Sequence, residues 1–215
     1  MAREGLPFLA TTAGLALICW LAVPQYPLLR YAAVFFGMLS AFMAFFFRDP
    51  ARTPPTEAGV MVSAGDGKVM EIAPAEAGEY LGEGCTRVSI FLSPLDVHIN
   101  RASIAGQVDF VEWHDGQYKP AYRADASVDN HHTAIGISNG DVRVVVKQIV
   151  GVLARRIVCR LEVGDELALG ERFGLIRFGS RVDHILPASA AVRVQVGDRV
   201  RAGETVIAVY PPSGA

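Results

Sequence analysis

The sequence predicts a mostly β domain, a flattened barrel or sandwich, preceded by an N-terminal helical hairpin that attaches to a membrane. Three observations predict this fold class. Two long uncharged apolar runs lie within the first 47 residues of the 215-residue chain. The rest has ordinary charge and consists of short Val- and Ile-rich runs separated by Gly, Asp and Asn, as in β-rich domains. A pattern of Gly-Asp and Gly-Glu turns also occurs twice near the C-terminus.

Residues 1–49 are expected to form the membrane anchor. Leu6–Val23 and Tyr31–Phe47 hold 18 and 17 uncharged residues. As helices they would each span about 25–27 Å, near the hydrocarbon thickness of a bilayer. Pro24 and Pro27 interrupt the apolar pattern between them. A secretory signal peptide fits poorly, since a second apolar run follows the first. A shallow or re-entrant hairpin stays an alternative to full spanning, because both runs are slightly short.

The charges flanking this region predict its orientation. Arg3 precedes the hairpin, and Arg48 and Arg52 follow it closely. A two-helix hairpin places both of its ends on one side of the membrane, and positively charged flanks favour the cytoplasmic side. The sequence therefore predicts attachment to the inner cell membrane, with the folded domain facing the cytoplasm.

Residues 50–58, which are rich in proline, are expected to form a linker, and residues 59–215 the β-rich domain. Pro94–Asn100 is expected to carry one short turn of helix. The strands predicted from the apolar runs are Val60–Ser63, Lys68–Ile72, Arg87–Leu92, Gln107–Trp113, Thr133–Ser138, Val142–Val150, Arg156–Leu161, Phe173–Arg177, Ala191–Val194 and Thr205–Tyr210.

An internal repeat supports the barrel architecture. Val163–Glu171 recurs 33 residues later as Val196–Glu204, and each copy is a Gly-Asp turn, a short extended piece and a Gly-Glu turn. This rhythm is similar to the hairpins of biotinyl and lipoyl carriers. Because the chain has no matching hairpin lysine, the repeat predicts the architecture and not the carrier activity.

Composition excludes several classes of function. A net charge of −2 excludes a broadly basic nucleic-acid binder, so no nucleic-acid partner is expected. The three cysteines, Cys19, Cys85 and Cys159, are odd in number, widely spaced and without metal-ligand spacing. We interpret them as reduced structural thiols, and no metal site is predicted.

The segment with the most chemical information is Arg177–His184, which indicates a strand, a Gly-Ser break and another strand. A Gly-Ser pair alone is typical of a β-bulge or a tight turn. Three further motif segments precede this pair along the chain. These are Phe47-Arg48-Asp49-Pro50, Val62-Ser63-Ala64-Gly65-Asp66-Gly67-Lys68-Val69 and Phe91-Leu92-Ser93-Pro94-Leu95-Asp96-Val97-His98-Ile99-Asn100-Arg101. Together with Phe178-Gly179-Ser180-Arg181, they resemble the short (type A) prokaryotic form of the phosphatidylserine decarboxylases over essentially the whole chain.

The resemblance implies that the chain is a proenzyme that cleaves itself between Gly179 and Ser180. The Ser180 hydroxyl would attack the carbonyl of Gly179, and the new N-terminus at position 180 would become a covalent pyruvoyl group. The resemblance assigns activation of Ser180 to His98, oriented by Asp66 as in a protease triad. The products would be a β chain of residues 1–179 and an α chain of residues 180–215, which form a heterodimer. Whether higher oligomers form stays open.

The implied activity is decarboxylation of phosphatidylserine, a membrane lipid, to phosphatidylethanolamine and carbon dioxide. The substrate amine would form a Schiff base with the pyruvoyl ketone, which accepts the electrons that the departing carbon dioxide leaves behind. His98 is the candidate proton donor, since a histidine pKa suits proton transfer near neutral pH. Arg181 is a candidate for binding the substrate phosphate or carboxylate. No metal or diffusible cofactor is implied.

The sequence departs from the family pattern at several positions. Arg101 stands where longer members carry a second histidine, so whether His98 serves both reactions stays open. Asn130-His131-His132 replaces a common Asn-Glu-Arg segment, and the roles of these two histidines are open as well. Asp96 is expected to shape the local turn. His184 would share a strand face with Ser180 but lie some 13 Å from it, and His114 is expected in a loop.

Two other functions are weighed against this prediction. A membrane-tethered barrel-sandwich adaptor would need coiled-coil heptads, which the sequence lacks. A pyruvoyl decarboxylase for a soluble amino acid would share the Ser180 chemistry but has no use for the apolar N-terminus. A relative that acts on another phosphatidyl-amino acid stays an alternative.

Overall fold

The computed structural model describes residues 1–75, 78–123, 125–152, 156–177 and 179–211. The chain forms two compact units, Met1–Ala51 and Arg52–Ala215. We treat each unit separately.

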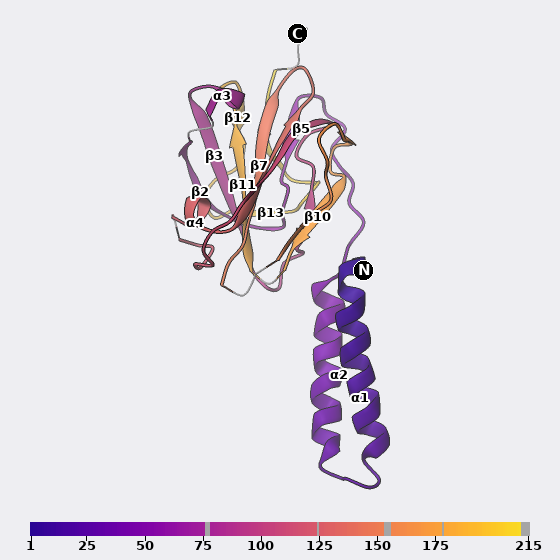
Figure 1. Cartoon of the computed structure of the whole chain (residues 1–215). Coiled ribbons are helices and arrows are strands. Elements are labelled where there is room, and N and C mark those ends of the chain that lie inside the picture. The colour runs from indigo at the N-terminus through magenta and orange to yellow at the C-terminus, as the bar shows by residue number, and fades with distance from the viewer. Residues whose placement is uncertain (76–77, 124, 153–155, 178, 212–215) are drawn as a thin grey trace. The chain divides into compact units, whose positions relative to one another are not determined.

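The first unit is a helical hairpin (Figure 1). A short 3₁₀ turn, Arg3–Gly5, leads into α1 (Leu6–Ala22), and α2 (Leu29–Phe46) follows after the proline-containing turn. Both helices are long and apolar enough to cross a membrane. The two ends of the unit meet, because the Ala2 N–H donates to the Phe47 carbonyl at 2.8 Å and the ring of Phe47 stacks on that of Phe8. The predicted hairpin is therefore confirmed.

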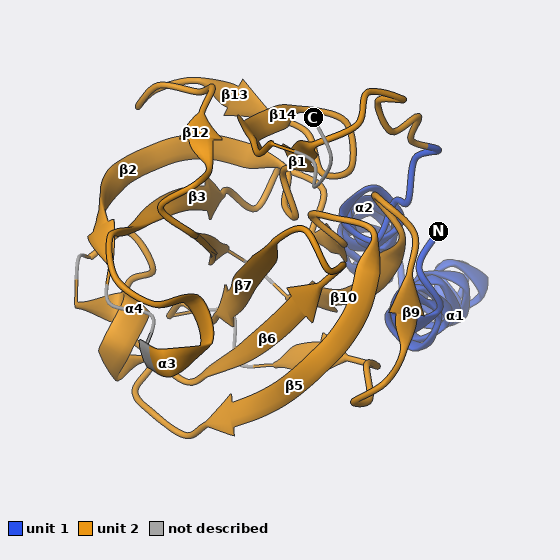
Figure 2. Cartoon of the chain, turned by 90° about the horizontal axis from the view of Figure 1, so that it is seen from above, with its two compact units in different colours: residues 1–51 blue, residues 52–215 orange. Residues whose placement is uncertain are grey.

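The second unit is mostly β, as predicted, and its main element is one antiparallel sheet of eight strands in the order β13-β2-β3-β11-β7-β6-β5-β9. Figure 2 shows this sheet curling round from β2 to β5 as a half-barrel. Two three-stranded sheets, β1-β14-β12 and β4-β10-β8, complete the unit. The strands are β1 (Val60–Val62), β2 (Gly67–Ala75), β3 (Cys85–Leu92), β4 (Ile99–Arg101), β5 (Gly106–His114), β6 (His132–Ser138), β7 (Arg143–Ile149), β8 (Ile157–Cys159), β9 (Glu166–Leu167), β10 (Arg172–Ile176), β11 (Ser180–Leu186), β12 (Ala191–Val192), β13 (Arg199–Val200) and β14 (Val206–Val209), and two single-turn helices are α3 (Gly78–Leu81) and α4 (Ala126–Asp129).

The sequence repeat builds the two edges of the curled sheet. Its first copy contains β9, which pairs with the start of β5, and its second contains β13, which pairs with the start of β2. The last residue but one of each copy is a glycine with positive φ, Gly170 and Gly203 respectively. The edges approach closely there, since a Cβ on Gly170 would lie 3.2 Å from the Cα of Gly203. The repeat thus brings the two edges of the half-barrel together.

Two local predictions are wrong. Pro94–Asn100 holds no helix: Ser93–Asp96 is a hydrogen-bonded turn, and β4 begins at Ile99. His114, expected in a loop, is the last residue of β5. In both places pairing with a distant strand decides the backbone conformation, because β4 pairs with β10 and β5 pairs with β6.

The central strand of the sheet is β11. It pairs with β3 on one side and with β7 on the other, and all seven of its residues are buried. Val182 and Leu186 join the main hydrophobic core and Ile185 joins a second, smaller cluster, and each fully buried aliphatic side chain contributes about 1.5–3 kcal/mol. The strand that begins with Ser180 is therefore held on both edges and on both faces.

Candidate active site

The predicted cleavage bond lies where the chain enters β11. Ser180 is the first residue of this strand and pairs with Leu92, the last residue of β3. Gly179 precedes it with a φ of 71°, a left-handed conformation that favours glycine. The motif residue Phe178 lies outside the described residues. The Gly179–Ser180 bond therefore joins a left-handed turn, which glycine adopts readily, to a fixed strand.

The Ser180 hydroxyl is buried and has no hydrogen-bond partner in the described part of the chain. A buried polar group without a partner costs about 1–3 kcal/mol, so such groups are rare in folded proteins. The Ser103 hydroxyl is in the same condition. What distinguishes Ser180 is its neighbours, because a histidine contacts the residue beside it.

That histidine is His98, which is 2% exposed. Its Nε2 accepts a hydrogen bond from the Gly179 N–H at 3.1 Å, and its Nδ1 lies 3.0 Å from the Asp96 carbonyl oxygen. An acceptor role for Nε2 puts the proton of the neutral ring on Nδ1, which then donates to Asp96. The basic nitrogen of His98 is thus turned toward the predicted cleavage bond.

Asp96 shapes the turn that carries His98, as predicted. Its Oδ2 accepts from the N–H and the hydroxyl of Ser93 at 2.8 and 2.7 Å, and its Oδ1 accepts from Arg199 at 2.9 Å. Asp96 therefore orients His98 through its backbone carbonyl, while its carboxylate braces the turn.

Asp66 has other partners. Its Oδ2 accepts from Arg52 at 2.7 Å, and its Oδ1 accepts from the Ala202 N–H at 2.8 Å. Burial raises the pKa of the Asp66 carboxyl, and the bonds from Ala202 and Arg52 oppose that rise. The structure thus brings together Gly179, Ser180 and His98, and it pairs Asp66 with Arg52.

Arg181, the candidate for binding the substrate phosphate or carboxylate, is fully buried. Its Nε donates to Asp183 at 2.6 Å, and its Nη2 donates to the hydroxyl of Ser89 at 2.7 Å. Asp183 is also fully buried, and its other oxygen accepts from Ser127 at 2.6 Å. Because these protein groups occupy its guanidinium, Arg181 anchors the start of β11 in the sheet.

The sequence did not single out Gly151, which contacts the scissile carbonyl. A Cβ at this position would lie 2.6 Å from the Gly179 carbonyl oxygen, so only glycine allows this close approach. Beside it lies an apolar hollow of about 200 Å³. It is lined by Phe91, Pro94, Pro120, Ala121, Tyr122, Gly151, Val152 and Gly179. Sequence spacing gives no sign of this contact, because Gly151 lies in a loop after β7.

The other histidines have different surroundings. His184 lies on β11 and is fully buried, with its Nε2 accepting from the Ala64 N–H at 2.8 Å. Burial lowers the pKa of His184 to about 4, so it is neutral at physiological pH. His132 is buried and stacks on His114, and His131 lies 3.3 Å from Asp115.

Comparisons with known proteins agree on one family. A family model described as phosphatidylserine decarboxylase matches residues 39–208. A phosphatidylserine decarboxylase proenzyme of Geobacter metallireducens is 39% identical over 98% of this chain and 97% of its own length. The proenzyme of Symbiobacterium thermophilum is 43% identical over 98% and 96%, and that of Mycobacterium leprae is 49% identical over 80% and 73%.

Proposed function

The chain belongs to the phosphatidylserine decarboxylase family, a family of carboxy-lyases made as proenzymes, and we propose that it cleaves itself between Gly179 and Ser180. The cleavage creates a pyruvoyl group at residue 180, and the mature enzyme converts phosphatidylserine to phosphatidylethanolamine and carbon dioxide. One observation carries this proposal: a buried Ser180 hydroxyl, without a partner among the residues that the structure describes, follows a glycine whose N–H is bonded to His98.

The proposed cleavage begins when His98 Nε2 exchanges its bond to the Gly179 N–H for the proton of the Ser180 hydroxyl. The hydroxyl oxygen attacks the Gly179 carbonyl carbon, and the peptide C–N bond breaks to leave an ester and a free amine at residue 180. Loss of the Cα proton of residue 180 then expels Gly179 as a carboxylate and leaves dehydroalanine. Water replaces the nitrogen of that residue, which releases ammonia and leaves the ketone.

The residues around the bond fit this reaction. Gly179 has no side chain to shield its carbonyl carbon, and Gly151 leaves room for its oxygen to move as the carbon becomes tetrahedral. The Arg181–Asp183 pair keeps the new N-terminus in place after the chain is cut. A pyruvoyl group formed at residue 180 would therefore lie beside His98, at the edge of the apolar hollow.

The strand pairing also supports a stable pair of cleaved chains. Residues 180–215 supply β11, β13 and β14, which pair with β3 and β7, with β2 and with β1 respectively. Cutting before Ser180 removes none of these ladders. We expect the α and β chains to stay together as a heterodimer.

When formed, the pyruvoyl group supplies an electron sink for the decarboxylation of a bound amine. The surrounding side chains have separate tasks: the hollow offers the substrate an apolar surface beside residue 180, and His98 donates a proton to the carbon that loses carbon dioxide. Orientation of His98 by Asp66 stays a prediction, and the backbone of Asp96 is the orienting group that the geometry supports. The apolar hairpin, flanked by Arg3 and Arg48, would hold the domain on the cytoplasmic face of the membrane.

The intact masses of three purified full-length proteins test the cleavage. Wild type should yield fragments of residues 1–179 and 180–215, the smaller one blocked at its N-terminus and reactive with a hydrazide. Ser180→Ala should stay whole. Ser103→Ala is the matched control, because Ser103 is the other buried hydroxyl that has no partner within the described ranges, and this variant should be cleaved like wild type. A wild-type chain that stays whole in a membrane would contradict the proposal and leave the tethered adaptor as the better function.

Substrate identity is tested on the cleaved enzyme. Phosphatidylserine should release carbon dioxide, whereas free serine should not, because a soluble substrate gives no role to the anchor. Faster turnover of another phosphatidyl-amino acid would contradict the proposed substrate while leaving the cleavage chemistry intact.

A further inference from the structure

The strand register gathers the active site at one end of the curled sheet. Ser180 pairs with Leu92, Arg181 with Ile149, and Ile149 with His132, which pairs with His114. We call this the reaction end of the sheet. The loops that project from it follow β3, β5 and β7 and precede β6 and β11. The single turns α4 and α3 lie at the reaction end and the opposite end respectively (Figure 1).

Exposed apolar side chains gather at the reaction end. In the described part of residues 52–215, eight large apolar side chains are exposed, and six of them lie on strand ends or loops of the reaction end. Those six are Leu95, Trp113, Tyr118, Tyr122, Val128 and Val152. Aromatic side chains with a polar edge are the type that collects at membrane–water interfaces.

Three of these side chains lie on the loop between β5 and β6, whose described residues are 115–123 and 125–131, and buried hydrogen bonds fix the conformation of this loop. Asn130 is fully buried, and its side chain donates to the carbonyls of Lys119 and Val150 and accepts from the Lys119 N–H. Gln117 bridges to Asn130, and Gly116 packs so tightly that a Cβ there would lie 2.4 Å from the Asp129 carbonyl oxygen. The packing of the described residues of this loop therefore fixes Tyr118, Tyr122 and Val128 in solvent-exposed positions.

Two cations and two carboxylates of the same loop are paired with one another, while a third carboxylate, Asp115, is exposed beside His131. Lys119 contacts both Asp125 and Asp129, and Arg123 donates to Asp125 through two nitrogens. The bond from Arg123, with that from Lys119, lowers the pKa of Asp125 to about 2, so the pair persists across physiological pH. A loop whose charges are neutralised locally costs less to bring against lipid than one with isolated carboxylates.

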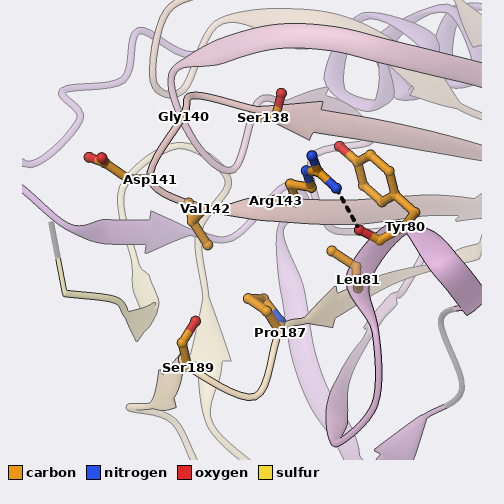
Figure 3. A pocket seen from close by; sticks show the side chains of 9 residues that line it. All are labelled: Tyr80, Leu81, Ser138, Gly140, Asp141, Val142, Arg143, Pro187 and Ser189. Carbon is orange, nitrogen blue, oxygen red and sulfur yellow. Dashed lines mark hydrogen bonds between the residues drawn. The ribbon is translucent and has the colours of Figure 1, made fainter. Parts of the chain in front are cut away.

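The opposite end of the sheet is polar. Its hollow, of about 350 Å³, is lined by Tyr80, Leu81, Ser138, Gly140, Asp141, Val142, Arg143, Pro187 and Ser189. Figure 3 shows the Arg143 guanidinium lying beside the Tyr80 ring and bonded to the Tyr80 carbonyl. Exposed apolar side chains are thus concentrated at the end that carries the reaction, with six of the eight in the described part of residues 52–215.

We propose that the reaction end is a docking surface for a phospholipid bilayer, with Trp113, Tyr122 and Val128 entering the headgroup region. This inference rests on the proposed function, since a substrate that stays in the bilayer must bring its amine to residue 180. The surface is continuous with the active site, because Tyr122 and Val152 line the hollow that also contacts Gly179. Docking would let a lipid headgroup reach residue 180 without leaving the membrane.

Tryptophan fluorescence tests the docking without reference to activity. The chain has two tryptophans, at positions 20 and 113, so Trp20→Phe leaves Trp113 as the only emitter. In vesicles that contain lipids brominated near the headgroup, Trp113 emission should be quenched and shifted to the blue. The control carries Trp20→Phe, Trp113→Phe and Val163→Trp; Val163 is exposed near the start of β5, away from the reaction end. Equal quenching at both positions, or none at Trp113, would overturn the proposal.

A second test uses matched substitutions of two exposed valines, which are 75% exposed at Val128 and 67% exposed at Val163. With phosphatidylserine in vesicles, Val128→Glu should lower kcat/KM about tenfold, because the variant loses the favourable free energy of burying one aliphatic side chain. With a short-chain phosphatidylserine dissolved as monomers, it should match wild type. Val163→Glu should match wild type in both assays. Equal vesicle activity of the two variants would overturn the docking surface, whereas a wild type inactive on both substrates would contradict the proposed function instead.

Discussion

The first residue of β11 and the rest of that strand differ in one respect. Arg181, Asp183 and His184 are fully buried polar residues, and each makes hydrogen bonds to protein groups. Ser180 is equally buried on the same strand, yet its hydroxyl has no partner in the described part of the chain. The fold therefore satisfies the polar groups that hold the strand and leaves unsatisfied the one that we propose reacts.

This difference indicates how the chain can keep a reactive hydroxyl buried in a stable fold. The cost of one unpaired hydroxyl, about 1–3 kcal/mol, is small beside the ladders and core that hold β11. An unpaired hydroxyl also needs no bond broken before it attacks the neighbouring carbonyl. The predictions below test the reactive position and the supporting positions separately.

The largest effect is expected at His98. Replacing a general base lowers a rate by about 10²–10⁴-fold, so His98→Gln should slow self-cleavage by that factor while the chain stays folded. The rate is measured by the appearance of the fragment of residues 180–215 after cell-free translation of the protein. His132→Gln is the control, since His132 pairs its Nδ1 with the Asn130 carbonyl. A His98→Gln chain that is cleaved at the wild-type rate would remove His98 from the reaction.

The supporting part of the strand is tested at Arg181. Arg181→Met leaves the Asp183 carboxylate buried without its cation, which should cost about 3–5 kcal/mol of unfolding free energy. Denaturant unfolding of the uncleaved Ser180→Ala chain in detergent measures this. Arg201→Met is the control, because Arg201 is 73% exposed in its side chain, and it should change stability little. The double variant Arg181→Met/Asp183→Leu should recover most of the loss, and a failure to recover would contradict an ion pair as the cause.

His184 should make the stability of the domain depend on pH. Its pKa is lowered by burial from 6.5 to about 4 in the folded chain, so the unfolded chain binds its proton first. The contribution of the neutral His184 to the free energy of unfolding is complete above pH 6.5. It is lost as the pH falls toward 4, by about 3 kcal/mol in total. His184→Gln, whose amide oxygen can still accept from Ala64, should flatten the curve between these pH values. An unchanged slope in that variant would assign the effect to other groups.

The smallest effect is expected at Gly151. Gly151→Ala places a Cβ 2.6 Å from the scissile oxygen, so the Gly179 carbonyl must shift. A displacement of this size should slow self-cleavage about hundredfold without unfolding the domain. Gly37→Ala, where a Cβ meets no atom within 4 Å, is the control. Normal cleavage in Gly151→Ala would show that the carbonyl has room to move.

Local signals in the sequence predicted much of this fold. The glycine turns of Val163–Glu171 and Val196–Glu204 predicted the repeated hairpin architecture, because a Gly-Asp or Gly-Glu pair marks a turn whatever its neighbours are. The apolar runs predicted the helical hairpin for the same reason, since length and composition decide whether a helix can span a bilayer. In both cases the information lies within a few residues of the element.

The central strand and parts of the site were harder to predict. A strand after Ser180 was predicted from the Gly-Ser break, but its place at the centre of the sheet was not, because Arg181, Asp183 and His184 are buried against partners distant in sequence, such as Ser89, Ser127 and Ala64. The bond between Asp66 and Arg52 and the contact between Gly151 and Gly179 also join distant segments. Such contacts follow from strand register and loop packing, which no local pattern in a single sequence reports. Family resemblance supplied Ser180 and His98, and the structure supplied their surroundings.

The central claim, that residue 180 becomes the group that reacts with the lipid amine, is tested most directly by reductive trapping. Purified wild-type enzyme is mixed with phosphatidylserine and cyanoborohydride, and the masses of both fragments are measured. The account predicts that the residue 180–215 fragment gains the mass of a reduced lipid adduct on its first residue, while residues 1–179 stay unmodified. An adduct on the larger fragment, or a smaller fragment that begins with an unaltered serine, would contradict it.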